Sequence, residues 1–350
     1  MKKFVLILLT ILVTLAVLEA FLKFVGFSRS ALVWHWVANY PSVYVLDSKN
    51  IYRPVQSYEI LPTRAKNQPI ALFVGDSFTY GNNAETDQSY PYFLKGILPE
   101  YSILNAGVPG YGPDQGYNVI LDHLEMLSKD VGGRPNILVW NINVNDIFDA
   151  EEIPVYKIQN GKLKSISGKI NYIYLQGVLR NYLPKPVYES HLLTLALISY
   201  RPFSQRLLYN QSVNLARQKI VTEIDNIIKL SEENEFLFML TLVPSQSQFA
   251  EVEEPYLKTD DEIIRQLLAQ YEGRKSEHFL YINLNKEIKT NTNTNVLGAS
   301  ANQNIDWGDK LFLKEEKVPV GARHLNREGN ISVANIVAEK LKTLLDESTD

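Results

Sequence analysis

The sequence predicts an α/β fold with a mostly parallel five-stranded sheet, preceded by an N-terminal transmembrane helix. Two observations predict the sheet. Short apolar runs alternate with helical patterns after residue 69, and turn residues follow the apolar runs. This alternation is typical of parallel strands joined by crossover helices. A third observation, the nearly unbroken apolar stretch over residues 4–22, predicts the membrane helix.

The composition excludes several kinds of site. The chain has 350 residues, enough for one large or two modest domains, and a formal net charge of −4, which gives no reason to expect nucleic acid as a partner. It contains no cysteine, so disulfides, thiolate metal sites and a cysteine nucleophile are excluded. Because no two histidines are four residues apart, we expect neither a metal nor another cofactor.

The N-terminal stretch is long enough to cross a membrane. Lys2 and Lys3 precede it, and Glu19 is the one charged residue within residues 4–22. No small-x-small cleavage site follows directly after Leu18, and apolar residues resume beyond it, which favours an anchor over residues 1–27 rather than a cleaved signal peptide. The two lysines favour a cytoplasmic N-terminus, which places the rest of the chain outside the cytoplasm.

The first strand of the predicted sheet leads to a serine. Residues 28–68 show no long period and contain several turn residues, which predicts a lead-in segment. An apolar strand over residues 71–74 then ends at Gly75, and Ser77 follows on a tight turn. A serine at such a turn is accessible to a base and to a carbonyl carbon, so Ser77 is the candidate nucleophile. The alternative is a serine that caps a helix.

The remaining strands and helices alternate to the end of the chain. Apolar runs predict four further strands, over residues 101–108, 136–143, 236–243 and 279–284. Apolar residues at helical spacing predict five helices. Their apolar faces are Tyr90, Phe93, Leu94 and Ile97; Tyr117, Ile120, Leu121, Leu124 and Leu127; Val213, Ala216, Ile220, Ile224 and Ile227; Ile263, Ile264, Leu267 and Leu268; and Ala334, Val337, Leu341 and Leu344.

One segment, residues 149–210, interrupts this alternation and is predicted to be an insertion at the edge of the sheet. Residues 155–166 alternate around Asn160-Gly161, a strong signal for a β-hairpin. The rest is rich in aromatic residues, for which packing is the favoured use and a carbohydrate, acyl or protein-partner site the alternative. These are Tyr172, Tyr174, Tyr182, Tyr188 and Tyr200. A polar loop is predicted over residues 291–304.

Polar and glycine residues follow three of the predicted strands, where functional groups gather in an open parallel sheet. Ser77 follows the first strand, Gly110 lies in the glycine-rich turn after the second, and Asn145 follows the third. A serine, a glycine amide and an asparagine side chain at neighbouring strand ends can surround one oxyanion. Of the five histidines, His324 is the best candidate base because it lies in a polar loop directly before the last helix.

Four sequence blocks in this order resemble those of the SGNH or GDSL hydrolases, most closely the bacterial members with an N-terminal membrane helix. The blocks are GDSFTYG, NAGVPGYG, NVND and HLN-REG, and the resemblance spans residues 71–345. It implies a hydrolase domain over residues 69–346, with a flavodoxin-like three-layer α/β/α sandwich. Ser77 resembles the nucleophile and first oxyanion amide. Gly110 and Asn145 resemble the other two oxyanion donors, and His324 resembles the base.

The sequence departs from this pattern at two places. Asn143 stands where the family usually has glycine, and it fits if the turn holds it in the left-handed conformation. The family also places an aspartate two or three residues before the histidine, where this chain has Ala322 and Gly321. A backbone carbonyl or a carboxylate from elsewhere would then have to orient the imidazole. The nearest carboxylates in the sequence are Asp306, Asp309, Glu315 and Glu316.

The resemblance and the membrane helix together imply a membrane-anchored serine esterase whose catalytic domain lies outside the cytoplasm. Its expected substrates are acylated small molecules, lipids or polysaccharides, such as an O-acetylated polysaccharide of the bacterial cell envelope. The same residues would also serve an acyltransferase. Because the usual aspartate is missing, the alternative is an SGNH domain without turnover that acts as a binding or scaffold module in envelope polysaccharide assembly.

Overall fold

A computed structural model describes most of the chain. The described residues are 2–25, 44–47, 49–54, 68–81, 88–128, 134–147, 156–159, 162–165, 183–188, 190–244, 246–249, 255–291, 310–313 and 324–347. The chain divides into two compact units: Met1–Ser57 with Pro154–Ser212, and Tyr58–Ile153 with Val213–Asp350. The second unit holds the large sheet and all four candidate site residues.

The large sheet has six strands, five of them parallel. β3 (Ile70–Gly75), β4 (Ser102–Gly107), β5 (Ile137–Ile142), β8 (Leu237–Leu242) and β10 (Phe279–Asn283) lie within two residues of the predicted strands, which confirms the predicted parallel sheet. The sixth strand, β9 (Lys275–Ser276), pairs antiparallel with β10 at the edge. The predicted count of five was therefore one too low, because two residues are too few to show an alternating pattern.

The strand order is that of flavodoxin-like folds. Across the sheet it runs β4-β3-β5-β8-β10-β9. Numbering the parallel strands along the chain from 1 to 5 gives the order 2-1-3-4-5. In such sheets ligands bind beyond the carboxyl ends of the strands, where the chain order reverses. Here that place lies between β3 and β5, the strands that Ser77 and Asn145 follow.

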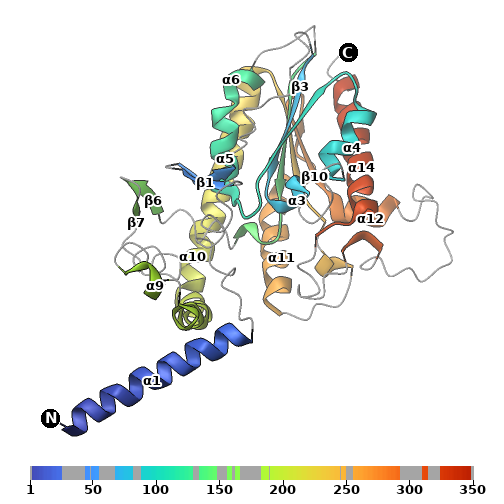
Figure 1. The fold of residues 1–350 in the computed structure, drawn as a ribbon. Helices are drawn as coiled ribbons and strands as arrows, with labels where there is room; N and C mark the ends of the chain where they lie inside the picture. The colour runs from blue at the N-terminus through green and yellow to red at the C-terminus, as the bar shows by residue number, and fades with distance from the viewer. Residues whose placement is uncertain are drawn as a thin grey trace. The chain divides into compact units, whose positions relative to one another are not determined.

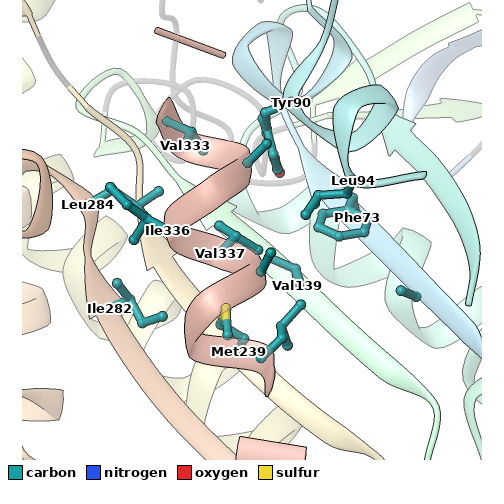
Figure 2. Close-up of a cluster of buried hydrophobic side chains, with 14 of the residues drawn as sticks. Phe73, Tyr90, Leu94, Val139, Met239, Ile282, Leu284, Val333, Ile336 and Val337 are labelled. Carbon is teal, nitrogen blue, oxygen red and sulfur yellow. The ribbon is translucent and has the colours of Figure 1, made fainter. Parts of the chain in front are cut away.

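Helices cover both faces of the sheet (Figure 1). α4 (Tyr90–Ile97), α12 (Leu284–Asn291) and α14 (Arg327–Glu347) lie on one face, and α5 (Pro113–Asp122) and the C-terminal part of α10 (His191–Asn234) lie on the other. Figure 2 shows Val337 of α14 beside Val139 of the sheet, Val333 beside Tyr90 of α4 and Ile336 beside Leu284 of α12, all within one buried cluster that includes Met239. The three-layer α/β/α architecture is confirmed, and the predicted apolar face of the last helix is fully buried at Ala334, Val337, Leu341 and Leu344.

Two predicted helices have different limits in the structure. α10 begins at His191 and continues for 44 residues, so the helix predicted from residue 213 starts inside the segment assigned to the insertion. Pro202 favoured a break there, since proline disfavours a helix interior. The helix predicted over residues 117–127 is instead two helices, α5 and α6 (Leu124–Leu127), with His123 between them. α11 (Pro255–Leu268) contains the predicted apolar residues 263–268.

The other unit contains α1 (Lys2–Phe24), two hairpins and the start of α10. The hairpin β6 (Tyr156–Gln159) with β7 (Lys162–Ser165) confirms the one predicted around Asn160-Gly161. A second hairpin, β1 (Tyr44–Asp47) with β2 (Ile51–Pro54), lies within the lead-in and was not predicted. This hairpin is short. Asp47 closes its turn, because its Oδ1 accepts hydrogen bonds from the backbone N–H groups of Lys49 and Asn50. The short helix α9 (Lys185–Tyr188) precedes α10.

Glu19, the one charge inside the apolar stretch of α1, contacts the first turn of α10. Its carboxylate accepts hydrogen bonds from Ser190 Oγ at 2.8 Å and from the backbone N–H groups of His191 and Leu192 at 2.9 Å. His191 Nδ1 lies 2.9 Å from the same carboxylate. These contacts satisfy N–H groups that the start of a helix otherwise leaves without partners, and the anion stabilises the positive end of the helix dipole.

Several predictions fall outside the described residues. They concern most of the lead-in, the loop over residues 292–304, and the aromatic residues Tyr172, Tyr174 and Tyr182.

Candidate active site

Ser77 is the first residue of α3 (Ser77–Tyr80), directly after the carboxyl end of β3. The residue that caps this helix is Asp76, whose Oδ1 accepts the Phe78 N–H at 2.9 Å. The capping-serine alternative is therefore wrong. Ser77 lies instead in the first turn, where backbone N–H groups are not used by the helix itself. The α3 turn ends at Gly81, whose φ of 85° is left-handed.

Two glycines let α3 lie close to the sheet. A Cβ atom on Gly107, the last residue of β4, would lie 2.4 Å from Tyr80 N and 2.8 Å from Thr79 C. One on Gly75 would lie 2.3 Å from Thr79 Oγ1. A side chain at either position would push α3, and with it Ser77, away from the strand ends. Gly75 and Gly107, the last residues of β3 and β4, thus fix how far Ser77 lies from the strand ends.

His324 and Ser77 are 247 residues apart in the sequence but are in contact in the structure. His324 Nε2 lies 2.9 Å from Ser77 Oγ, within hydrogen-bond distance for proton transfer. The imidazole also packs on the ring of Phe78, with centroids 4.9 Å apart and planes tilted by 39°. This confirms that the fold brings together the serine and the histidine of the first and last sequence blocks.

The backbone around His324 is held by a short antiparallel contact. The His324 carbonyl accepts the Leu313 N–H at 2.8 Å, and the Leu311 carbonyl accepts the Asn326 N–H at 2.9 Å. Phe312 and Leu325, the residues between these bonds, form a β-bridge and are buried. The imidazole therefore projects from a segment whose backbone is fixed on both sides.

Asparagines behind His324 fix the same segment to α14 and α4. Asn326 Nδ2 donates to the Lys310 carbonyl at 2.7 Å, and Asn326 Oδ1 accepts the Gly329 N–H at 2.9 Å. Asn330 Nδ2 donates to the Leu325 and Asn326 carbonyls, and Asn330 Oδ1 accepts the Tyr90 N–H at 3.1 Å. The sequence block HLN-REG and the asparagine after it thus combine the candidate base with the side chains that hold it.

Gly110 lies in a turn after β4. The Tyr111 N–H donates to the Val108 carbonyl at 3.0 Å, with Pro109 and Gly110 at the two central positions. The φ of Gly110 is 78°, and this pattern of proline followed by a left-handed glycine is that of a type II turn. Gly112 then caps α5. The structure places Gly110 at the strand end next to that of Ser77; its role as an oxyanion donor stays a prediction.

Asn145 follows β5, and its side chain is held by Asp76. Asn145 Nδ2 donates to Asp76 Oδ2 at 3.3 Å, and Asn143 Nδ2 lies 3.5 Å from the same oxygen. Asn143 Oδ1 accepts the Val144 N–H. Among the described residues Glu235 is the one non-glycine with positive φ, so Asn143 is not in the left-handed conformation expected from the family's glycine. It takes a conformation open to any residue, and its side chain binds within the turn.

Asp76 is a fully buried carboxylate at the centre of these contacts, with 3% of its surface exposed. Burial raises the pKa of its carboxyl above the ordinary value. The Phe78 N–H, the charge of His324 and the amides of Asn145 and Asn143 oppose this shift by stabilising the anion. Because its partners all donate to it, the carboxylate form fits this site.

A buried polar cluster beneath Ser77 was not predicted. Asn141, inside β5, donates to Thr79 Oγ1 at 2.9 Å, and its amide also contacts the hydroxyls of Tyr90 and Thr241. These contacts join α3, β5, α4 and β8. The signal in the sequence was the asparagine inside the apolar run ILVWNI, because a buried amide must find hydrogen-bond partners.

The group that would orient His324 from its other side is not identified. Gly321 and Ala322 lie outside the described residues, and so do the four nearby candidates Asp306, Asp309, Glu315 and Glu316. Within the part of the chain that the structure describes, no three His, Asp or Glu side chains gather as a metal site would require.

The comparisons with known proteins find similar folds at low sequence identity. No protein-family model matches the sequence, and no curated protein matches it. The solved structures similar to it include a member of the lipolytic protein G-D-S-L family from Veillonella parvula, 13% identical, covering 79% of this chain and 98% of its own, with a TM-score of 0.39.

Another is an acetylxylan esterase from Geobacillus stearothermophilus, 13% identical, covering 79% of this chain and 94% of its own, with a TM-score of 0.38. The fold class itself follows from the strand order, and the candidate site from the contact between Ser77 and His324. The structural neighbours of this chain include G-D-S-L lipolytic proteins and acetylxylan esterases.

Proposed function

We propose that the chain is a serine esterase in which Ser77 is the nucleophile and His324 the base. The observation that carries this proposal is the 2.9 Å contact between Ser77 Oγ and His324 Nε2 at the carboxyl edge of a flavodoxin-like sheet. The acylated substrates expected from the sequence are of the kind named for the acetylxylan esterases among the structural neighbours.

In the proposed mechanism His324 accepts the proton of Ser77 as Oγ attacks the ester carbonyl carbon. The carbonyl oxygen becomes an oxyanion, which the N–H groups of Ser77 and Gly110 and the side chain of Asn145 stabilise. His324 returns the proton to the leaving alcohol, leaving an acyl group on Ser77. Water, activated by His324, then attacks the acyl-enzyme and releases the acid. A sugar hydroxyl in place of water gives an acyltransferase.

The proposed location is the outer side of the membrane, with α1 retained as an anchor. α1 has 23 residues and is about 35 Å long, enough to cross the hydrocarbon of a bilayer. The contacts of Glu19 with Ser190, His191 and Leu192 support retention, because cleavage after α1 would remove the carboxylate that caps α10. An O-acylated polysaccharide or lipid of the cell envelope would be within reach of such a site.

Hydrolysis of p-nitrophenyl acetate by the detergent-solubilised full-length protein tests the proposal. We expect Ser77→Ala and His324→Ala each to lower kcat/KM by at least about 10³-fold, since removing the serine or its base in a serine protease costs about 10⁶-fold in kcat. Ser128→Ala is the matched control, since among the described residues its hydroxyl binds the Glu125 carbonyl of α6, at the surface and away from Ser77 and His324. Equal rates for Ser77→Ala and the wild type would contradict the nucleophile assignment.

The same assay addresses the alternative of a binding or scaffold module without turnover, which the absence of aspartate at residues 321 and 322 motivates. A folded wild-type protein that hydrolyses none of a series of short-chain esters, with or without a sugar acceptor, would favour that alternative. Transfer to the acceptor in preference to water would identify an acyltransferase.

A further inference from the structure

We infer that Tyr90 is a positioning residue that sets the distance between Ser77 and His324: its hydroxyl supports the turn of the nucleophile, and its backbone N–H holds the segment of the base. The inference rests on the proposed function. Tyr90 is the first residue of α4, and only 1% of its surface is exposed. It belongs to neither segment and acts on each through a hydrogen-bonded neighbour.

The hydroxyl of Tyr90 is joined to α3 through Asn141. The Asn141 amide donates to the Tyr90 hydroxyl and to Thr79 Oγ1, the second bond at 2.9 Å. Thr79 lies two residues after Ser77 in the same short helix and is fully buried. Asn141 is itself fixed in β5, where its amide also donates to the Val74 carbonyl at 3.3 Å. The hydroxyl therefore helps to fix an amide that holds the turn of Ser77.

The backbone N–H of Tyr90 is joined to the histidine segment through Asn330. As the first N–H of α4 it has no acceptor within its own helix, and it donates to Asn330 Oδ1 at 3.1 Å. Asn330 Nδ2 donates to the carbonyls of Leu325 and Asn326, at 3.2 Å and 3.0 Å. These are the two residues that follow His324. Asn330 is buried, so water does not compete for these bonds.

These bonds join two segments that come from different parts of the sheet. Ser77 follows β3, and His324 lies directly before α14, yet Ser77 Oγ and His324 Nε2 are 2.9 Å apart. A displacement of about 1 Å would take the two atoms beyond hydrogen-bond distance, so their spacing must be held closely. The ring of Phe78 on the imidazole also joins the segments, and this contact would leave part of the activity when Tyr90 is changed.

The alternative is that Tyr90 only fills the core. Its ring packs edge to face on Phe73 of β3, with centroids 5.7 Å apart and planes at 75°, and Val333 of α14 lies beside it (Figure 2). A phenylalanine would serve this packing equally well, because its ring is the same. A variant that lacks only the hydroxyl therefore separates the two roles.

The substitution Tyr90→Phe, in the detergent-solubilised full-length protein, is that variant. The Asn141 amide then loses one acceptor, and its hold on Thr79 weakens. We expect kcat for p-nitrophenyl acetate to fall by about 10-fold with KM changed by less than about twofold, because the ester still binds while the contact between Ser77 and His324 loosens. Labelling of Ser77 by a fluorophosphonate should slow by a similar factor. A wild-type kcat and labelling rate in folded Tyr90→Phe would overturn the inference.

Tyr271→Phe is the matched control. Tyr271 is equally buried, its hydroxyl donates to Asp225 Oδ1 at 3.1 Å, and its ring packs edge to face on Phe279. Phe279 begins β10, so this tyrosine lies near the amino ends of the strands, away from Ser77. Both variants should lower the midpoint of urea unfolding, but Tyr271→Phe should keep the wild-type kcat. Equal losses of kcat would assign the effect to stability and overturn the inference.

A double-mutant cycle with Asn330→Ala tests whether the two links act in series. Asn330→Ala releases the histidine segment from the Tyr90 N–H and should lower kcat by at least about 10-fold. If Tyr90 joins the two segments, one broken link already frees them, so Tyr90→Phe should lower kcat by much less in this background. Losses that multiply would show two independent local supports and overturn the inference.

A second variant covers the case in which Asn330→Ala does not fold, as judged by circular dichroism. Asn330→Asp then takes its place in the cycle, because aspartate keeps an acceptor for the Tyr90 N–H but loses the donors to the Leu325 and Asn326 carbonyls. The same coupling is expected, and its absence would again overturn the inference.

Failure of the proposed function gives a different result. Ser77→Ala with wild-type hydrolysis contradicts the esterase assignment, whereas wild-type kinetics of Tyr90→Phe in an enzyme that needs Ser77 contradict only the inference. Labelling by the fluorophosphonate needs no ester turnover, so its rate in Tyr90→Phe decides the inference even if p-nitrophenyl acetate is not hydrolysed.

Discussion

The proposed catalytic role of Asn145 can be tested separately from its contribution to stability. Replacing it with alanine should lower kcat by about 10²- to 10³-fold with little change in KM, since the lost donor acts on the oxyanion. Asn234→Ala is the matched control. Asn234, the last residue of α10, donates to the Leu230 carbonyl at 2.8 Å, so its loss should lower the unfolding free energy by about 1 kcal/mol. Steady-state kinetics and urea unfolding of both variants check this, and equal kinetic losses would contradict a donor role for Asn145.

Glu223 makes the stability of the fold depend on pH. This buried residue of α10 lies with Asp114 of α5 around Lys219. Burial, and then the charge of Asp114, raise the pKa of Glu223 to about 9. The folded state therefore binds a proton that the unfolded state releases above pH 4.5, so stability falls as pH rises from about 4.5 to 9.

The substitution Glu223→Gln should remove this dependence. At pH 8 we expect the variant to be at least about 1 kcal/mol more stable than the wild type, with the difference vanishing near pH 4. Thermal unfolding of both proteins between pH 4 and 9 measures it. If the difference in unfolding free energy between the two proteins stays constant from pH 4 to 9, the pKa of Glu223 is not raised.

For single residues, the sequence predicted which ones belong to the candidate site better than it predicted their contacts. Ser77 and His324 could be found because each sits in a recognisable block, and the fold brings them within 2.9 Å. The contact of Asp76 with Asn145 could not be predicted, because spacing along the chain does not reveal that the Asp76 carboxylate reaches the turn after β5. The left-handed conformation expected for Asn143 was also wrong. Its φ is negative, and its side chain accepts the Val144 N–H within the turn.

The approach of α3 to β4 is the contact between elements that most directly controls the site. In Gly107→Ala the new Cβ would meet backbone atoms of Thr79 and Tyr80, which cannot rotate away. We expect a loss of about 2–3 kcal/mol in unfolding free energy and a reduced kcat, because Ser77 moves with α3. Gly96→Ala on α4, where nothing lies within 4 Å of the added atom, should instead stabilise by about 0.5 kcal/mol with unchanged kinetics. Unchanged kinetics in Gly107→Ala would contradict the positioning argument.

Strands and helices were predictable where the burial of their side chains produces a long apolar pattern in the sequence. The five parallel strands are apolar because helices cover both faces, and this gave their positions within two residues. The continuous α10 was not predictable, because Pro202 and the change in composition near residue 210 both favour an interruption. β9 and the hairpin β1–β2 are too short to show a period.

For the molecule as a whole, α1 is proposed to remain attached and to anchor the catalytic domain. An epitope tag at the N-terminus should therefore stay with the full-length protein in the membrane fraction. Glu19→Leu should keep the protein in the membrane but weaken the start of α10, because three hydrogen-bond donors, Ser190 Oγ and the backbone N–H groups of His191 and Leu192, lose their acceptor.

Limited proteolysis of membranes measures this second effect. Cleavage near residues 185–200 should be faster in Glu19→Leu than in the wild type, whereas Thr14→Leu, whose hydroxyl binds only its own helix, should behave as the wild type. A mature protein without the N-terminal tag would show that α1 is a cleaved signal peptide.

The long apolar N-terminal helix and the large sheet were both predictable, since each depends on composition over many residues. The division of the chain between Ser212 and Val213, inside α10, was not predictable, because no glycine or proline marks it. The substrate is a property of side chains around the site rather than of the fold, so it remains a proposal.

The most direct test of Ser77 as nucleophile and His324 as base is covalent labelling with a fluorophosphonate, followed by mass spectrometry of the digested protein. We expect one adduct, on Ser77, absent from Ser77→Ala and formed far more slowly in His324→Ala, because the base must take the proton of the attacking hydroxyl. An adduct on another residue, or the same labelling rate in His324→Ala as in the wild type, would contradict these assignments.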